Sequence, residues 1–253
     1  MRKTIRKIYK TVFRNRFIIP LIEIKPANIG SYIIFWRDYF KYRQLTNKFP
    51  LYLQPRLGEK TSKTLFDSHY FYQSIWTVKK IQASKPLEHV DVGSQVDLVG
   101  FLTTITNVKF VDIRPLDADL DKLTNVKGNI SNLPFQDNTI KSLSCLHVAE
   151  HIGLGRYGDL LDPMGTEKAC RELIRVLAPG GQLYFSVPIG KEETYFNAHR
   201  VHLPETIIKY FNGLKLIEFS AVTDQGQLIY DANPELFHNA KYSCGLFHFT
   251  KPK

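Results

Sequence analysis

Cysteine is scarce in this sequence, which has only three in 253 residues: Cys145, Cys170 and Cys244. An odd number of widely separated cysteines excludes a disulfide framework, and none of them has the spacing of a zinc-binding motif. We therefore expect a cytoplasmic protein, and the sequence predicts no metal site.

Long hydrophobic runs are also missing. The most apolar N-terminal stretch, FIIPLIEI, is short and is interrupted by Pro20 and Glu23. It fits neither the apolar region of a signal peptide nor a membrane span. With 43% hydrophobic and 23% charged residues, the composition is that of an ordinary globular protein.

Acidic residues are rare in the first part of the chain. Residues 1–60 hold 14 Lys and Arg against 3 Asp and Glu, whereas the remainder holds 20 against 21. A domain that grips nucleic acid usually carries a basic face. The nearly neutral remainder therefore argues against nucleic acid as a partner of the main domain.

The first 19 residues show helical periodicity, with basic side chains opposite an apolar side made of Ile5, Ile8, Tyr9, Val12, Phe13 and Phe17. Two interpretations stay open. The helix lies in the interface of an anionic membrane, which would hold the protein peripherally on the inner face. Alternatively, its apolar stripe packs on its own domain while the basic residues face water.

The chain divides at about residue 63 into two parts. Residues 1–63 are expected to form a basic, aromatic N-terminal extension with a helix near 30–45 and an extended connector. Residues 64–253 begin with a helix from residue 66 and then alternate between strand and helix patterns. The predicted strands are 88–93, 108–113, 125–130, 140–147, 181–188, 214–221 and 244–250, and the predicted helices are 95–105, 164–178 and 203–213. This alternation predicts a doubly wound α/β fold with a mostly parallel, seven-stranded sheet and an antiparallel pair at one edge.

In such sheets, ligands bind beyond the carboxyl ends of the strands. The stretch HVDVGSQVDLVGFL, residues 89–102, has the outline of a strand, a turn and a helix, with one glycine in its turn, Gly93. A glycine there lets the backbone approach a ligand closely, and Asp91 is placed to receive a cationic amino group. Asp112 follows 19 residues after Gly93, the spacing of an acid that binds the ribose of a nucleoside. The alternative is an ordinary strand-to-helix turn.

Five motifs, DVGSQ, VDIRP, GNISNLPF, SLSCLHVAEHI and RVLAPGGQLYFSVP, fall in the order found in class I S-adenosylmethionine-dependent methyltransferases. Within that superfamily, the runs HYFYQSIW, HVDVGSQ, EHIGLGRYGD and FNAHR resemble a branch of methyltransferase-like proteins associated with bacterial surface-polysaccharide gene clusters. The resemblance covers residues 66 to about 222. It implies S-adenosylmethionine as the cofactor, and transfer of its methyl group to oxygen, or else nitrogen, of a sugar or related small molecule.

The resemblance also implies which residues bind the cofactor. Asp91 and Gly93 would lie at its methionine end, and Asp112 would bind the ribose. Ser94 and Gln95 stand where the superfamily usually has further glycines. The remaining cofactor-binding candidates are Ile113, Asn129, Ile130 and His147. For Pro179-Gly180-Gly181 we expect a turn before the fifth long strand, without a chemical role.

Polar side chains cluster after the fourth and fifth predicted strands, where the acceptor is expected. A hydroxyl acceptor benefits from a general base, and the candidates for the catalytic residues are His151, His199 and Glu150. The candidates for binding the acceptor are His69, Tyr70, Arg156, Tyr157, Asp159, Asn197 and Arg200, of which His69 and Tyr70 would close over the site. The simpler alternative is that Arg156 and Asp159 merely pair with each other.

The acceptor itself is expected to be a small molecule or glycan, linked to a nucleotide or a lipid. Two other functions stay open. The chain is a catalytically inactive methyltransferase fold that serves as a scaffold at the membrane, or it carries another sugar-modifying transferase activity on the same fold.

Overall fold

The computed structural model describes residues 29–46, 48 and 50–253. The predicted helix over residues 1–19 lies outside these residues. Contacts within the chain divide it into two units, Met1–Leu65 and Phe66–Lys253.

In the first unit, helix α2 (Ile29–Leu45) occupies the predicted position, and none of its residues is buried. Ile33, Phe40 and Leu45 are among its exposed apolar side chains. Among the residues that the structure describes, no helix combines the length and apolar character needed to cross a bilayer.

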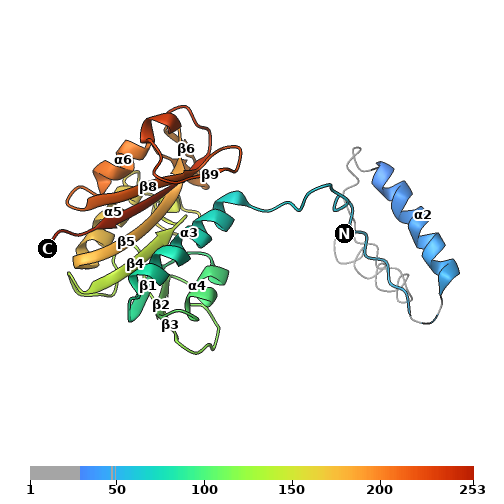
Figure 1. Ribbon diagram of the computed structural model, residues 1–253, viewed down its shortest axis with the longest axis horizontal. Coiled ribbons are helices and arrows are strands. Elements are labelled where there is room, and N and C mark those ends of the chain that lie inside the picture. The colour runs from blue at the N-terminus through green and yellow to red at the C-terminus, as the bar shows by residue number, and fades with distance from the viewer. Residues whose placement is uncertain (1–28, 47, 49) are drawn as a thin grey trace, which may run out of the picture. The chain divides into compact units, whose positions relative to one another are not determined.

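The second unit is built on an eight-stranded sheet with the order β3-β2-β1-β4-β5-β10-β8-β9 (Figure 1). Strands β1 to β5 pair in parallel, and β10 runs antiparallel between β5 and β8. Seven strands lie at the predicted places: β1 (Glu88–Val92), β2 (Asn107–Asp112), β3 (Leu123–Lys127), β4 (Ile140–Leu146), β5 (Leu177–Ile189), β8 (Lys215–Val222) and β10 (Ser243–Thr250). The eighth, β9 (Leu228–Ile229), is too short to leave a pattern in the sequence. The mostly parallel doubly wound sheet and its antiparallel edge are confirmed.

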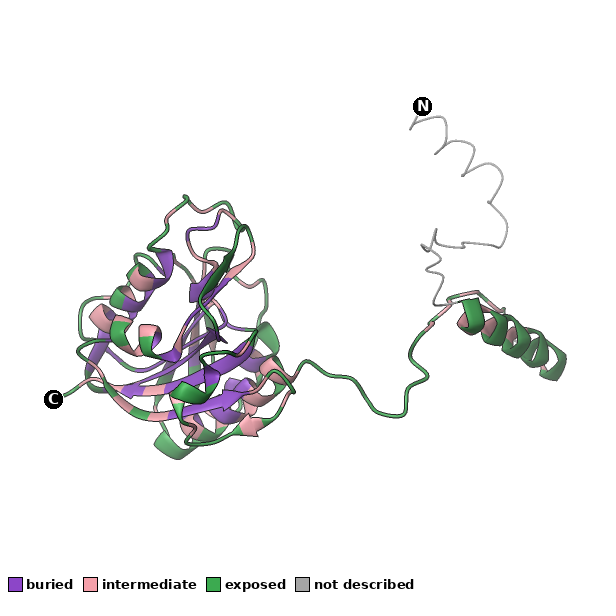
Figure 2. Cartoon of the chain, turned by 90° about the horizontal axis from the view of Figure 1, so that it is seen from above, coloured by how far each residue is buried: buried purple, intermediate pink, exposed green. Residues whose placement is uncertain are grey.

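Helices cover both faces of the sheet. On one face, α3 (Ser68–Ser84) and α4 (Val96–Leu102) bury Trp76 and Leu98 against β2, β5 and β10. On the other, α5 (Gly165–Val176) and α6 (Pro204–Tyr210) contribute Leu173 and Ile207 to a larger cluster. The central strands are accordingly buried on both sides, as Figure 2 shows, and their apolar runs are those expected of a covered parallel sheet.

The start of α3 is fixed by a side-chain cap. Asp67 accepts hydrogen bonds from the backbone N–H groups of His69 and Tyr70, at 3.0 and 3.2 Å, and so satisfies two donors that the first helical turn leaves unpaired. At the other end, Lys85 adopts φ 47° and its N–H closes onto Ile81. The cap therefore determines where the His69 side chain leaves the helix.

Two predictions about local structure are wrong. The segment around residues 193–201, expected as a loop, forms a hairpin of β6 (Glu193–Tyr195) and β7 (His199–Val201). Strands of three residues are too short to leave an alternating pattern. Strand β5 begins at Leu177 rather than 181, so Pro179-Gly180-Gly181 lies inside the strand. Two short 3₁₀ helices, η2 (Ala149–His151) and η3 (Pro234–Phe237), complete the unit.

Candidate functional site

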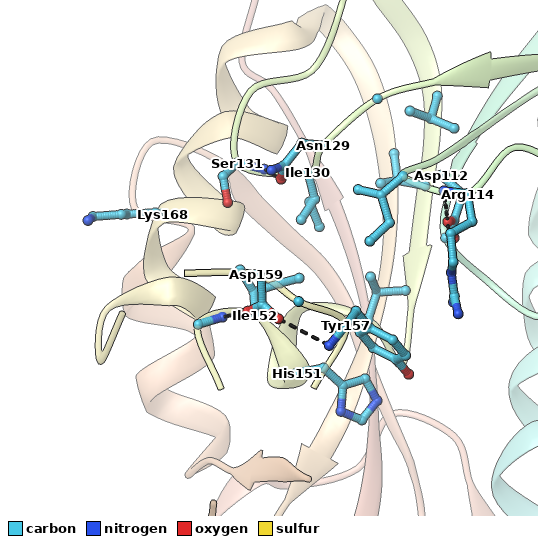
Figure 3. Close-up of a pocket in the computed structure, with 18 of the residues that line it drawn as sticks. Asp112, Arg114, Asn129, Ile130, Ser131, His151, Ile152, Tyr157, Asp159 and Lys168 are labelled. Carbon is cyan, nitrogen blue, oxygen red and sulfur yellow. Dashed lines mark hydrogen bonds and ion pairs between the residues drawn. The ribbon is translucent and has the colours of Figure 1, made fainter. Parts of the chain in front are cut away.

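A cavity of about 520 Å³ opens at the carboxyl ends of β1, β2, β3 and β4, the edge at which doubly wound sheets bind ligands. This volume is within the range of small-molecule and cofactor sites. Its lining includes Gly93, Asp112, Ile113, Asn129, Ile130, His147, His151, Tyr157 and Asp159 from the predicted set. Figure 3 shows most of these side chains around the opening, together with Arg114, Ser131 and Lys168.

The turn after β1 needs its glycine. Gly93 has φ +69°, and a Cβ atom there would lie 3.1 Å from Cγ1 of Val148 and 3.7 Å from Oδ2 of Asp112. Both the left-handed backbone and the crowding disfavour any side chain. The backbone at Gly93 is therefore exposed directly to the cavity.

Asp91 does not line this cavity, although we expected it to contact the ligand. Its side chain is completely buried, Oδ1 accepts from the backbone N–H of Ser94 at 3.0 Å, and Oδ2 accepts from the hydroxyl of Ser144. Burial raises the pKa of Asp91 to about 6, against the opposing effect of these hydrogen bonds. Asp91 thus holds the turn through its hydrogen bonds with Ser94 and Ser144.

The neighbours Ser94 and Gln95 also lie outside the cavity lining. Ser94 is buried, and its Oγ accepts from the backbone N–H of Leu146 at 3.1 Å. Gln95 is exposed at the position before α4 and makes no side-chain cap. The loop therefore contributes Gly93 to the cavity and uses the side chain of Ser94 to hold β1 against β4.

Asp112 lies at the end of β2 with one carboxylate oxygen available. Oδ1 accepts from the backbone N–H of Arg114 at 2.7 Å. Among the described residues, Oδ2 has no hydrogen-bond partner, and it is the oxygen directed toward Gly93. The adjacent Ile113 is partly exposed in the cavity. This pairing of an acceptor oxygen with an apolar side chain suits the ribose and base of a nucleoside.

Across the cavity, the end of β3 supplies Asn129 and Ile130. The side-chain oxygen of Asn129 accepts from the backbone N–H of Ser131 at 2.9 Å, which leaves its NH₂ group as a donor. Gly128 precedes them because a Cβ atom would lie 2.6 Å from Val111. Close packing of β3 on β2 therefore brings Asn129 and Asp112 to the same cavity.

His151 is the predicted base that does line the cavity. Its Nδ1 lies 2.6 Å from the carbonyl oxygen of Ala198. Only an N–H can donate to a carbonyl, so in a neutral ring this contact favours the tautomer with the proton on Nδ1 and a lone pair on Nε2. Nη1 of Arg156 also approaches the ring, at 3.1 Å from Nδ1 and 3.5 Å from Nε2. Nε2 lies 3.7 Å from Oε1 of Glu150, close enough for the carboxylate to stabilise a protonated ring.

Glu150 itself is fully buried and does not reach the cavity, contrary to its prediction as a catalytic group. Its Oε1 accepts from Nδ1 of His147 at 2.9 Å, while Oε2 has no partner among the described residues. Burial raises the pKa of Glu150, but the hydrogen bond from His147 and its charge more than offset this, and the pKa is lowered. Glu150 is a positioning residue for the two histidines.

The loop after η2 carries Arg156, Tyr157 and Asp159, and the first and last do not pair as the simpler alternative supposed. Asp159 accepts from the backbone N–H groups of Gly153 and Tyr157. Burial alone would raise the pKa of the Asp159 carboxyl. The hydrogen bonds from these N–H groups, that of Gly153 most of all, outweigh burial, so the pKa lies below its usual value. Arg156 instead donates to the carbonyl of Ala198 at 3.3 Å and lies 5.2 Å from the Tyr157 ring.

Arg200 is predicted to bind the acceptor, yet it is buried and fully used within the protein. Its guanidinium donates to the carbonyl oxygens of Ile152 at 2.6 Å and Asp162 at 3.0 Å. Burial lowers its pKa. Arg200 therefore clamps the loop that borders the cavity.

The other four predicted residues lie outside the cavity lining. Asn197 is exposed at the hairpin tip, where it adopts φ 60°. His199 stacks near Tyr195 and Tyr242, and burial lowers its pKa. His69 and Tyr70 lie beside His147, with ring centroids 5.6 and 5.5 Å away. The predicted acceptor set thus separates into a cavity group and an aromatic group around His147.

Sequence reasoning missed Arg114, Lys168 and Tyr242. Arg114 stands two residues beyond Asp112, and its guanidinium lies 4.8 Å from the Tyr157 ring; its position at a strand end was a usable signal. Lys168 comes from α5 and pairs with Asp162 at 2.6 Å. Tyr242 precedes the last strand, where no local pattern marks it.

Comparison with known proteins gives a partial family match and a clear likeness of fold. Residues 125–241, somewhat less than half of the chain, match the family described as Caenorhabditis protein of unknown function, DUF268. No curated protein sequence matches the chain significantly.

Solved structures of three proteins illustrate the likeness. The N-methyltransferase NodS from Bradyrhizobium japonicum, in complex with S-adenosylhomocysteine, superimposes with a TM-score of 0.51 at 14% identity, over 73% of this chain and 88% of NodS. Phosphoethanolamine N-methyltransferase 2 from Haemonchus contortus superimposes with a TM-score of 0.54 at 13% identity, over 72% of this chain and 53% of that protein. The [4+2]-cyclase SpnF superimposes with a TM-score of 0.50 at 14% identity, over 71% of this chain and 81% of SpnF. At such identities the likeness concerns the fold, and the second unit has the α/β fold of class I methyltransferases.

Proposed function

We propose that the chain is an S-adenosylmethionine-dependent methyltransferase that acts on oxygen, or else nitrogen, of a sugar or related small molecule in surface-polysaccharide biosynthesis. One observation carries the enzymatic part of the proposal. A single cavity is lined by Gly93 and Asp112 at its nucleoside-type end and also by the imidazole of His151. The choice of a sugar rests on the resemblance of the sequence motifs.

The residues at the cofactor end fit a nucleoside with a short charged tail. Asp112 offers its unpaired Oδ2 to ribose hydroxyls, and Ile113 and Ile130 give apolar contact to a flat base. Gly93 lets the tail pass the backbone without a side chain in the way. When bound there, S-adenosylmethionine supplies an electrophilic methyl group on a sulfonium sulfur.

At the acceptor end, His151 would take the proton of a hydroxyl through Nε2. Loss of that proton would make the hydroxyl oxygen a better nucleophile toward the methyl group that the bound cofactor would supply. The carboxylate of Glu150, 3.7 Å from Nε2, would stabilise the imidazolium that results. A positioned base of this kind contributes about 10²–10⁴-fold to a rate.

The rim of the cavity supports an anionic group on the acceptor. The Tyr157 ring lies between two guanidinium groups, with Arg114 at 4.8 Å and Arg156 at 5.2 Å. Arginine binds phosphate through paired N–H groups. An acceptor linked to a nucleotide or lipid phosphate would place its phosphate at these two arginines.

Calorimetry tests the cofactor half of the proposal. We expect S-adenosylmethionine and S-adenosylhomocysteine to bind the full chain, and Asp112→Ala to weaken both about 10- to 100-fold, because hydrogen bonds to a charged group contribute about 1.5–3 kcal/mol each. Asp121→Ala is the matched control, since Asp121 is exposed and outside the cavity lining. Absence of binding at millimolar ligand, or equal affinities in the two variants, would contradict the assignment.

Release of S-adenosylhomocysteine with nucleotide-linked sugars as acceptors tests the catalytic half. His151→Ala should reduce turnover about 100-fold or more while leaving cofactor affinity within about twofold. His238→Ala, which removes an exposed histidine elsewhere in the unit, should change neither. A cofactor that binds without turnover on any acceptor of this class would favour the scaffold alternative.

A further inference from the structure

Three residues from distant parts of the chain meet beside the cavity with the chemistry of a metal site. His69 lies in the first turn of α3, His147 follows β4, and Cys244 lies in β10. Each offers one ligand atom, and these atoms all lie within 4.8 Å of one another. We propose that His69, His147 and Cys244 bind one Zn²⁺ ion. The proposal does not rest on the proposed methyl transfer, although His147 also lines the cavity.

His147 is the best-prepared ligand. It is buried, with 8% of its surface exposed, and its Nδ1 lies 2.9 Å from Oε1 of Glu150. Its other ring nitrogen, Nε2, is buried without a hydrogen-bond partner among the described residues. A carboxylate that accepts from one ring nitrogen and leaves the other for a metal is the usual support of a zinc-bound histidine. A buried nitrogen that is left unpaired otherwise destabilises the fold.

The backbone at His147 adds to this picture. His147 adopts φ 56°, a left-handed conformation that is unfavourable for a non-glycine residue. Its N–H donates to the carbonyl of Ser186 at 2.9 Å, which holds the turn in place. The fold thus maintains a strained residue whose side chain turns an unpaired nitrogen toward the cluster.

Cys244 supplies the soft ligand. Its side chain is completely buried and forms no disulfide. Its sulfur lies 3.9 Å from the carbonyl oxygen of Gly245 and also interacts with the His147 ring. Zinc would displace the thiol proton to solvent and leave the thiolate bonded to the metal. The positive ion then compensates a buried negative charge that would otherwise be costly.

His69 completes the set from the opposite side. Its ring is stacked between those of His147, at 5.6 Å, and Tyr242, at 5.3 Å. None of the described residues forms a hydrogen bond with its ring nitrogens. The ring is therefore oriented by stacking while both nitrogens stay available.

The ligand set and spacing favour zinc. Two imidazoles and one thiolate form a typical Zn²⁺ environment and are poor ligands for Mg²⁺ or Ca²⁺. Bond lengths of about 2.0 Å to nitrogen and 2.3 Å to sulfur put the ligand atoms of a tetrahedral site about 3.3–3.6 Å apart. Side-chain shifts of about 1 Å would close the present cluster onto one ion. Three protein ligands leave a fourth position for water.

Metal analysis of the full chain tests the proposal. The protein, stripped with a chelator and reloaded with Zn²⁺, should retain one ion per chain after desalting. Cys244→Ala and His69→Ala should each weaken zinc at least 100-fold in a competition titration with a chromophoric chelator. Cys170→Ala is the matched control, because Cys170 is also a completely buried free thiol but lies outside the cluster. It should retain one ion.

Cobalt gives a second readout. Co²⁺ in place of Zn²⁺ should show a thiolate-to-metal charge-transfer band that disappears in Cys244→Ala and persists in Cys170→Ala. His69→Ala guards against misfolding, since His69 is only partly buried. A stripped wild type that takes up no zinc, or equal zinc affinities in the Cys244 and Cys170 variants, overturns the site. Asp112→Ala should bind zinc normally, so failure here is distinguishable from failure of the cofactor proposal.

Discussion

Acid should weaken the fold through His89, a histidine enclosed in the sheet. His89 lies in β1 with no exposed surface, and its two ring nitrogens lie 2.8 Å from the hydroxyls of Ser142 and Ser144 on β4. Burial lowers its pKa from 6.5 to about 3. The His89 side chain is therefore protonated near pH 6.5 in the unfolded chain, but only near pH 3 in the folded chain.

The sign and size of the effect follow from this difference. Because the unfolded state gains the proton first, stability is lost as the pH falls from about 6.5 toward 3. At pH 5, which is about 1.5 pH units below the unfolded pKa, the loss through His89 is about 2 kcal/mol. At pH 8 it is close to zero.

Urea unfolding of wild type and His89→Asn at pH 8 and pH 5, followed by the fluorescence of buried Trp76, measures this loss. Asparagine keeps polar atoms in the site and does not titrate. Lowering the pH from 8 to 5 should therefore change the difference in free energy of unfolding between His89→Asn and wild type by about 2 kcal/mol, in favour of the variant. With an m-value of about 2 kcal/mol/M, the gap between the midpoints should change by about 1 M. A gap that is the same at both pH values would refute the argument.

Two further substitutions test the loops that border the cavity. Gly93→Ala should cost about 1–2 kcal/mol through its positive φ and also weaken S-adenosylmethionine binding, because the new Cβ presses on Val148. Gly213→Ala, at φ +102° with nothing within 4 Å, should show only the stability cost in the same urea and calorimetric measurements. Arg200→Gln should lose about 1–3 kcal/mol by leaving two loop carbonyls unpaired, and trypsin should then cleave after Arg156 faster than in wild type. Unchanged cleavage would mean that Arg200 does not hold the loop.

The sheet was predictable because its central strands are buried on both faces. Their apolar runs, separated by amphipathic segments, left a pattern of the right length for seven strands. The β6–β7 hairpin and β9 were not predictable, since strands of two or three residues contain less than two full alternations.

The candidate site was predictable in position and less so in role. Strand ends identified Gly93, Asp112 and Asn129, all of which line the cavity. The sequence could not show that Ser144 occupies one oxygen of Asp91, or that backbone carbonyls occupy Arg200, because both depend on partners far away in the chain. The cluster of His69, His147 and Cys244 could not be predicted for the same reason.

These distant partners explain how the turn after β1 is held with a single glycine. In loops with several glycines, backbone freedom allows the chain to turn closely around a ligand. Here the Asp91 carboxylate accepts from the Ser94 N–H, and the Ser94 hydroxyl accepts from the Leu146 N–H, so side chains fix the turn from beneath. Ser144 joins this network to His89. Only the residue whose backbone faces the cavity then has to be glycine, and that residue is Gly93.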